Sequence, residues 1–230
     1  MIDTAILQGI VKILFVCVII TAAYIITTRN LLSLVSVYAL QSLTLAFLAL
    51  ALWFLESDPV LLAIAGITVV SKVLLIPYFI ATVQERIRIK RDIEFHFISP
   101  TSSLIVSMAL MLVVYIALTR ILRGTPARDN LFFFGAVLGI SLMLMGMMVM
   151  LSRKRAITKV LGFLSMENGV LLFGMFVTEL PFIIEFLIII DLIILVLLTT
   201  ILTIGIDSTL EDYQKRLHRF HLWEGPGEGP

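Results

Sequence analysis

The sequence is poor in the residues that build disulfides and metal centres. It contains one cysteine, Cys17, which lies inside a long apolar run. A lone cysteine excludes an internal disulfide, a metal–sulfur cluster and a cysteine-based zinc site. No segment has the spacing of a phosphate-binding loop or of a nucleophile motif. The sequence therefore indicates no catalytic site in this chain, and no cofactor or metal is expected.

The net charge is also small, at a formal value of +1 over 230 residues. A value so close to zero gives no overall field that would attract nucleic acid, and no nucleic-acid partner is expected. What the chain has in excess is apolar residues, at 60% of the sequence against about 45–50% in soluble domains. These residues form long blocks, which indicates an integral protein of the lipid bilayer.

Seven apolar blocks are each long enough, at roughly 20 residues, to cross a hydrocarbon core of about 30 Å. Helices are expected, because alternating barrel strands would not read as unbroken apolar runs. The predicted fold class is therefore all-α, a polytopic membrane helix bundle in residues 1–206, followed by a cytoplasmic amphipathic tail over 207–230. The predicted spans are 5–27, 31–54, 60–82, 101–121, 131–151, 157–178 and 182–206.

Basic residues are distributed unequally between the two ends of these spans. If the N-terminus lies on side one, that side receives only Arg120, Arg123 and Arg128 between its helices. The positive-inside rule then predicts an outer N-terminus and a cytoplasmic C-terminus. The basic residues assigned to the cytoplasmic side are Arg29, Arg86, Arg88, Lys90, Arg91, Arg153, Lys154, Arg155, Lys159, Lys215, Arg216 and Arg219.

Two parts of the chain resemble each other. TRNLLSLVSVYALQSLTLA and SRKRAITKVLGFLSMENGV both begin with basic residues, and both are followed by a turn with an acidic residue near a proline. This similarity suggests two parallel three-helix repeats, 5–82 and 131–206, joined by a linking helix over 101–121. In this pairing Gln41 is expected opposite Glu167. Duplication and chance similarity both stay open.

The most informative residues are polar side chains near the middle of the apolar runs. Glu167 lies about ten residues into the sixth span, near the bilayer midplane at 1.5 Å per residue. Asp191, Lys72 and Gln41 are predicted at a similar depth in the seventh, third and second spans, and Glu185 closer to the outer boundary. A carboxylate at the centre of a membrane helix raises the free energy of membrane insertion by roughly 2.5–3.5 kcal/mol, so its presence requires an explanation.

Proton transfer is the functional interpretation, since acids and a lysine at one depth, bridged by water, can pass protons between them. The structural alternative treats the acids as neutral groups bonded across helix interfaces, Lys72 as a packing salt bridge and Gln41 as helix–helix glue. Glu185 could instead extend toward outer water. The proton-transfer interpretation requires that Glu167, Asp191 and Lys72 meet one another, and water, between helices.

Two other features are interpreted as structural. The aliphatic stem of Lys12 is expected to lie along the apolar surface, so that its ammonium reaches toward the outer membrane interface. The methionine-rich stretch SLMLMGMMVM is expected to pack against another helix rather than to conduct copper.

Several strings resemble a known group of membrane proteins. RNLLSLVSVYALQ and KVLGFLSMENGVLLF each resemble the second helix of the K-type subunit of complex I and of the C-type subunit of Mrp cation/proton antiporters. The whole chain, with VLLIPYF after Lys72 and ELPFIIEFLIIIDLII after GFLSMENGVLLFG, resembles component E of the hydrogenase-4 and formate hydrogenlyase membrane arm. The resemblance covers most of the chain and its motifs are short and hydrophobic.

The resemblance implies a non-catalytic membrane subunit of a complex I-like, ion-translocating respiratory oxidoreductase in the prokaryotic cytoplasmic membrane. Implied partners are antiporter-like subunits, a quinone-binding-subunit-like membrane anchor and a nickel–iron hydrogenase or equivalent redox module on the cytoplasmic side. K-type subunits carry two membrane glutamates assigned to a central hydrophilic axis. The first falls where this chain has Leu164, one turn before Glu167 on roughly the same face, and Asp191 is nearest to the second.

Three functional hypotheses remain. In the first, the chain contributes Glu167, Asp191, Lys72 and Glu185 to a proton-transfer axis, with Gln41 as a supporting polar neighbour. In the second, it is a structural spacer or assembly subunit of the same type of complex. In the third, it is an autonomous secondary transporter and would then show ion flux by itself in liposomes. A related alternative is a subunit of an Mrp-like cation/proton antiporter.

Overall fold

The computed structural model describes residues 4–28, 30–87, 99–121, 130–153, 156–177, 189–191, 193–194 and 196. Within these residues the chain is helical and forms no strand. The predicted all-α membrane bundle is therefore confirmed. In chain order the elements are α1 (Thr4–Thr27), α2 (Leu31–Glu56), α3 (Pro59–Thr68), the π-helix η1 (Val69–Leu75), α4 (Ile76–Ile87), α5 (Pro100–Ile121), α6 (Asn130–Ser152) and α7 (Ala156–Val177).

Six helical stretches in the described residues are long and apolar enough to cross a membrane. They match the first six predicted spans to within a few residues, and α3, η1 and α4 follow one another as a single continuous rod. The predicted seventh span, 182–206, is described only at 189–191, 193–194 and 196. The predicted tail over 207–230 lies outside the described residues.

Helix caps define the short connection between α2 and α3. Ser57 adopts a left-handed conformation with a φ of 55°, and its N–H donates to the carbonyl of Trp53 at 2.8 Å. Asp58 then caps α3, because its carboxylate accepts a hydrogen bond from the backbone N–H of Val60 at 2.9 Å. Pro59 occupies the first helical turn, where its missing N–H costs nothing. The acidic residue and proline therefore reverse the chain, as the sequence pattern predicts.

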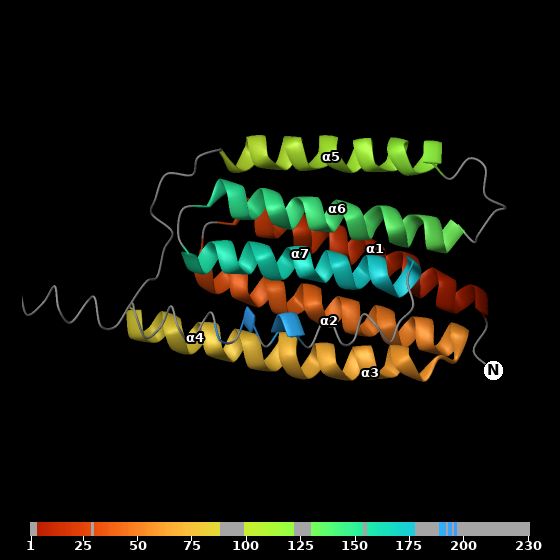
Figure 1. Cartoon of the computed structure of the whole chain (residues 1–230), viewed down its shortest axis with the longest axis horizontal. Coiled ribbons are helices and arrows are strands. Elements are labelled where there is room, and N and C mark those ends of the chain that lie inside the picture. Colours follow the sequence, from red (N-terminus) through yellow and green to blue (C-terminus); the bar gives the residue numbers. More distant parts are fainter. Residues whose placement is uncertain are drawn as a thin grey trace, which may run out of the picture.

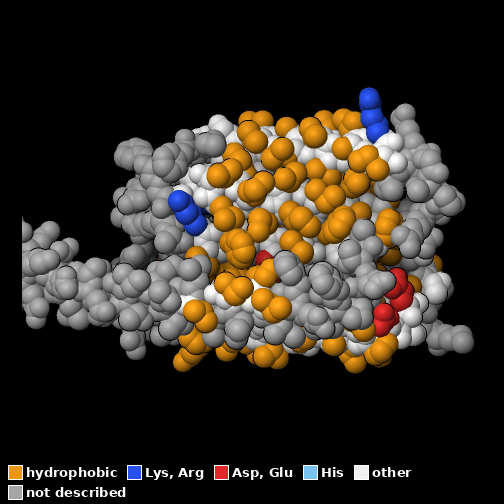
Figure 2. Space-filling model, in the orientation of Figure 1, with side chains coloured by type: hydrophobic (Ala, Val, Ile, Leu, Met, Phe, Trp, Pro, Cys, Tyr) orange, Lys and Arg blue, Asp and Glu red, His pale blue; other side chains and the backbone are white. Residues whose placement is uncertain are grey.

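The helices lie roughly parallel or antiparallel in one bundle (Figure 1). α6 packs against α7 and α1 packs against α2, while α1 also contacts α6 and α2 also contacts α7. The rod formed by α3, η1 and α4 lies along α2 on one flank, and α5 lies beside α6 and α1 on the other (Figure 1). Hydrophobic side chains cover most of the described surface on the face in Figure 2, as a lipid-facing surface requires.

Glycines bring α6 and α7 close together. The five that face the opposite helix are Gly135, Gly139, Gly146, Gly162 and Gly169. A Cβ on Gly139 would lie only 2.6 Å from the Cα of Phe173, and one on Gly162 would lie 2.9 Å from the backbone nitrogen of Met150. Small residues let the two helix backbones approach closely. The close approach strengthens van der Waals contacts, which matter because the hydrophobic effect does not drive helices together in lipid. Met143 and Met150 pack against the α7 glycines, so the predicted packing role of the methionine-rich stretch is confirmed.

Arg153 is buried at the end of α6. It is one of the basic residues assigned to the cytoplasmic side, and it is only 1% exposed in the structure. Its Nη2 donates to the carbonyls of Ile25, Ile26 and Thr28 at 3.3, 3.2 and 2.6 Å. These carbonyls belong to the end of α1, where no further helical turn can satisfy them. Arg153 therefore ties the end of α6 to the end of α1.

The repeat hypothesis remains a prediction after the fold is known. α1 and α2 lie beside α6 and α7 respectively, but the third helix of the second copy falls in 182–206. One detail of the pairing is wrong: with Thr28 opposite Ser152, Gln41 aligns with Ser165, two residues before Glu167.

Candidate functional site

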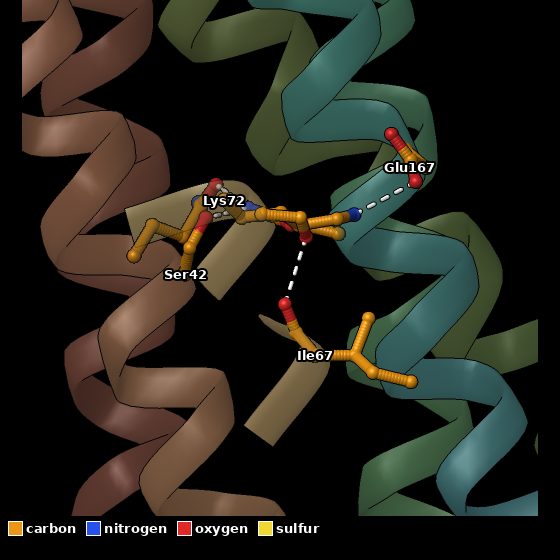
Figure 3. Close-up of polar contacts among 7 residues, drawn as sticks. Ser42, Ile67, Lys72 and Glu167 are labelled. Carbon is orange, nitrogen blue, oxygen red and sulfur yellow. Dashed lines mark hydrogen bonds and ion pairs between the residues drawn. The ribbon is translucent and has the colours of Figure 1, made fainter. Parts of the chain in front are cut away.

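A buried ion pair joins the third span to the sixth. The Nζ of Lys72 lies 2.9 Å from Oε1 of Glu167, and the side chains are 0% and 2% exposed. Figure 3 shows the lysine crossing from η1 to α7, with its ammonium directed at the carboxylate. Burying two charges costs several kcal/mol per ion, which close contact between opposite charges offsets. The pair therefore explains how each charge is tolerated inside an apolar bundle.

The π-helix η1 positions the lysine. Its seven residues, Val69–Leu75, interrupt an otherwise α-helical rod at the level of Lys72. A π-turn holds one more residue than an α-turn and leaves backbone carbonyls less regularly paired, and such turns often occur at functional sites. The hydroxyl of Ser71 donates to the carbonyl of Ile67 at 2.9 Å, which gives that carbonyl a partner (Figure 3). Lys72 is thus held on a locally irregular helix.

An amide network extends from the ion pair to α2. Lys72 Nζ donates to Oδ1 of Asn168 at 3.3 Å, and Nδ2 of Asn168 donates to Oε1 of Gln41 at 3.2 Å. The same nitrogen donates to the hydroxyl oxygen of Ser42 at 3.1 Å, and the Ser165 hydroxyl donates to Gln41 Oε1 at 3.1 Å. All of these side chains are buried. The network connects η1, α2 and α7 through the interior of the bundle.

Asp191 lies next to Glu167. Its carboxyl group lies within electrostatic range of the Glu167 carboxyl group. Asp191 is 9% exposed, and neither of its oxygens accepts a hydrogen bond from any described residue. The Tyr38 phenol is fully buried near Ser42 and within electrostatic range of both acids, although its hydroxyl makes no hydrogen bond of good geometry within the described residues. Several buried polar atoms near the middle of the bundle therefore have no hydrogen-bond partner within the described residues.

The site carries more acid than base. Lys72 is the only cation that acts on Glu167 within the described part of the chain, and Asp191 adds a second carboxyl group beside Glu167. Ionisation of all three groups would leave one uncompensated negative charge, which is costly in a low-dielectric interior. A proton shared between Glu167 and Asp191 removes that charge and supplies the missing donor. The arrangement can therefore hold a proton on one of the two acids.

The structure brings together four of the five residues predicted for the site. Glu167, Asp191, Lys72 and Gln41 form one cluster with their neighbours. Leu164, where the family glutamate would fall, is buried one turn from Glu167. Glu185 lies outside the described residues. The roles assigned to these residues remain predictions.

Sequence reasoning missed Asn168, Ser165 and Ser42. Asn168 follows Glu167 directly and links Lys72 to Gln41, so it is the centre of the network. Its position beside a mid-span acid was an available signal. Ser165 gave no comparable signal, because a serine in a membrane helix usually bonds to its own backbone. No group of three or more His, Cys, Asp or Glu side chains in the described residues could hold a metal ion.

Comparison with known proteins finds no relative: no family model, curated protein or solved structure matches this chain.

Proposed function

We propose that this chain is a non-catalytic membrane subunit of a complex I-like, ion-translocating oxidoreductase of the membrane-bound hydrogenase or formate hydrogenlyase type. In this proposal Lys72, Glu167 and Asp191 belong to a proton-transfer axis within the membrane. Gln41 and Asn168 orient the groups and complete their hydrogen bonds. Redox chemistry takes place in partner subunits. These are the antiporter-like subunits, the quinone-binding-subunit-like anchor and the cytoplasmic redox module that the family resemblance implies.

The observation that carries the proposal is the Lys72–Glu167 pair with a second carboxyl group beside it. Intramembrane ionisable residues that face a bundle interior mark ion pathways and proton relays more often than passive packing. Ions are also commonly held near the midplane where helices are interrupted, as η1 interrupts the third span. The acid beside the Lys72–Glu167 pair offers a second position for a proton, which is a property required of a relay.

The structural-spacer alternative is favoured by one observation, the fixed position of Asn168 in the amide network. Asn168 uses both its oxygen and its nitrogen in hydrogen bonds, as a fixed packing element does. A buried pair is weak support for stability by itself, since an apolar replacement of similar volume is often neutral. The two hypotheses therefore differ in whether turnover-coupled proton movement depends on the two acids.

Substitution in the assembled complex separates these hypotheses. We expect Glu167→Gln and Asp191→Asn to abolish or strongly reduce proton uptake coupled to turnover in sealed membrane vesicles, while assembly is retained. Matched controls are Glu56→Gln, at the exposed end of α2, and Asp58→Asn, which preserves the α3 cap. If coupled proton uptake survives both site substitutions in a fully assembled complex, the relay hypothesis is wrong and the spacer hypothesis stands.

The proposed assembly has a separate test that does not depend on the site. We expect the neighbouring open reading frames to encode a hydrogenase large subunit and antiporter-like membrane proteins. Affinity purification of the tagged chain from its own membranes should recover the same subunits. The purified chain alone should produce no ion flux in liposomes, and flux there would instead support an autonomous transporter.

The expected location is the prokaryotic cytoplasmic membrane, with the N-terminus outside and the C-terminus in the cytoplasm. A Cys17→Ala background removes the only thiol, so a single cysteine added at either end can be labelled selectively. A membrane-impermeant reagent applied to intact cells should label a cysteine at the N-terminus and leave one at the C-terminus unlabelled. The reverse pattern would overturn the predicted orientation.

A further inference from the structure

An apolar groove opens between α1, α5 and α6, on the opposite flank from the η1 rod. Its volume is about 840 Å³. Among the described helices α5 packs mainly against α6 and α1, and many of its large apolar side chains are exposed, among them Ile105, Met108 and Leu112. The groove exists because α5 is not drawn against the bundle by close glycine contacts of the kind that join α6 to α7.

The walls of the groove fit a hydrocarbon chain. Ligand pockets in proteins have volumes of about 300–1,000 Å³, and this groove falls within that range. On α1 the lining residues Lys12, Phe15, Val16 and Ile19 follow helical spacing, so one face of the helix contributes a strip about 10 Å long. Nearly all of the wall is aliphatic or aromatic, so water would find almost no hydrogen-bonding partner there.

One charge lies on this apolar wall. Lys12 is the only Lys, Arg, His, Asp or Glu among the described residues that line the groove, and its side chain is exposed rather than enclosed by protein. It forms no ion pair with any other described residue. It lies about 12 Å along α1 from Thr4, so its flexible stem can bring the ammonium toward the near membrane interface. An anion at that interface would complement it.

A second cation lies at the same end of the bundle. The chain direction puts the start of α1 and the end of α5 on one side (Figure 1). Arg120 occupies the last turn of α5 there and is exposed. A molecule with an apolar tail in the groove and an anionic head above Lys12 therefore meets positive charge on both flanking helices.

We propose that the groove binds an acyl chain of an anionic phospholipid whose phosphate pairs with the Lys12 ammonium. The lipid fills the space that the loose attachment of α5 leaves, and its headgroup supplies the counter-charge that the described protein lacks at Lys12. This inference does not rest on the proposed function, because it uses none of the residues of the ion-pair site.

Lipid retention by the full-length chain tests the proposal. The chain, purified in mild detergent, is incubated with phosphatidylglycerol or phosphatidylcholine of identical acyl chains, and bound lipid is counted by native mass spectrometry. We expect one lipid retained at high collision energy, with phosphatidylglycerol preferred about fivefold, as one lysine–headgroup contact of about 1 kcal/mol predicts. Lys12→Gln should remove the larger part of the preference and leave only the weaker contribution of Arg120, whereas Lys159→Gln, at an exposed lysine outside the groove, should keep the preference unchanged.

A second variant tests the acyl-chain site separately from the charge. Ala109→Phe places a ring in the groove and should lower retention of both lipids by at least tenfold, whereas Leu74→Phe, on an exposed face of η1, should not. Circular dichroism checks that both variants remain folded. Unchanged preference in Lys12→Gln, unchanged retention in a folded Ala109→Phe, or a lipid-free dimer that buries this face would each overturn the proposal.

Discussion

Lys72 and Lys12 both lie within apolar spans of this chain, and their surroundings are opposite. Lys72 is fully buried, is paired with Glu167 at 2.9 Å and also donates to Asn168. Lys12 is exposed, lines an open apolar groove and has no ion-pair partner among the described residues. A membrane protein can thus accommodate a lysine by supplying the counter-charge itself or by directing the ammonium toward the interface. The first solution fixes helix packing, and the second leaves it loose.

The same contrast extends to the helices that carry each lysine. The interior where α2, η1 and α7 meet is filled by side chains that bond to one another across helices. The space between α1, α5 and α6 retains a cavity of about 840 Å³. Stability is therefore expected to depend strongly on residues of the first region and weakly on residues of the second.

Replacing each lysine with methionine gives the largest contrast. Lys72→Met leaves a buried carboxylate without its cation and should lower the free energy of unfolding by about 3–5 kcal/mol. Lys12→Met should change it by no more than about 0.5 kcal/mol, because its head lies outside the packed interior. Chemical unfolding in detergent micelles, followed by circular dichroism, measures both. Similar losses in the two variants would contradict the contrast.

The double variant refines the first result. Adding Glu167→Gln to Lys72→Met removes the orphaned charge, so the double variant should lose less stability than the sum of the single variants. The expected coupling is about 0.5–3 kcal/mol. A coupling of zero would mean that the two side chains do not depend on each other in solution.

Arg153 and Arg120 form a second matched pair. Arg153→Met frees three carbonyls at the end of α1 and should lower the free energy of unfolding by about 1.5–3 kcal/mol. Arg120→Met, on an exposed final turn of α5, should fall within about 0.5 kcal/mol of the parent chain. The same unfolding assay applies. An equal effect at Arg120 would indicate that α5 is anchored more firmly than its packing implies.

Gly139 and Gly66 compare a closed helix interface with an open one. An alanine Cβ at Gly139 meets the backbone of Phe173, which cannot move aside without shifting α7, so a loss of about 1–3 kcal/mol is expected. Nothing lies within 4 Å of a Cβ added at Gly66. Gly66→Ala should therefore be neutral or stabilising by up to about 1 kcal/mol, through helix propensity alone. Destabilisation of equal size at both positions would rule out the close-contact explanation.

The smallest effect is expected on the outer face of α5. Ile105 is 63% exposed, so Ile105→Ala should change the stability of the isolated chain by no more than about 0.5 kcal/mol. If a partner subunit covers this face in an assembled complex, the same substitution should weaken co-purification of that partner. A loss of stability in the isolated chain would show that α5 packs more tightly than the groove suggests.

The spans and the mid-membrane cluster could be predicted because both depend on position along a single helix. Length and hydropathy determine a span, and counting residues inward places Lys72, Gln41 and Glu167 at one depth. Meeting at one depth also requires suitable rotation of each helix, and the sequence contains no direct measure of it. The agreement arises because unpaired charges in hydrocarbon are costly enough to force such groups together.

Other features depend on contacts between helices and could not be predicted. Arg153 reads as one more basic residue at a cytoplasmic boundary, and only the neighbouring end of α1 makes it a buried cap. Asn168 becomes the link between Lys72 and Gln41 through the rotation of α7. The sequence does not distinguish Gly139 and Gly162 from other glycines in membrane helices, because their role depends on the backbone of the opposite helix.

The π-turn at Val69–Leu75 has a consequence for substitution patterns along the third span. One additional residue in a helix rotates everything beyond it by about 100° relative to an uninterrupted α-helix. Residues of α3 and α4 that share a heptad position therefore face different neighbours. A single helical wheel drawn across 59–87 would assign the residues on one side of the turn to the wrong face of the helix. Deleting one residue from the turn would restore regular winding but turn either Lys72 or Ile80 away from the interior in which both are now fully enclosed.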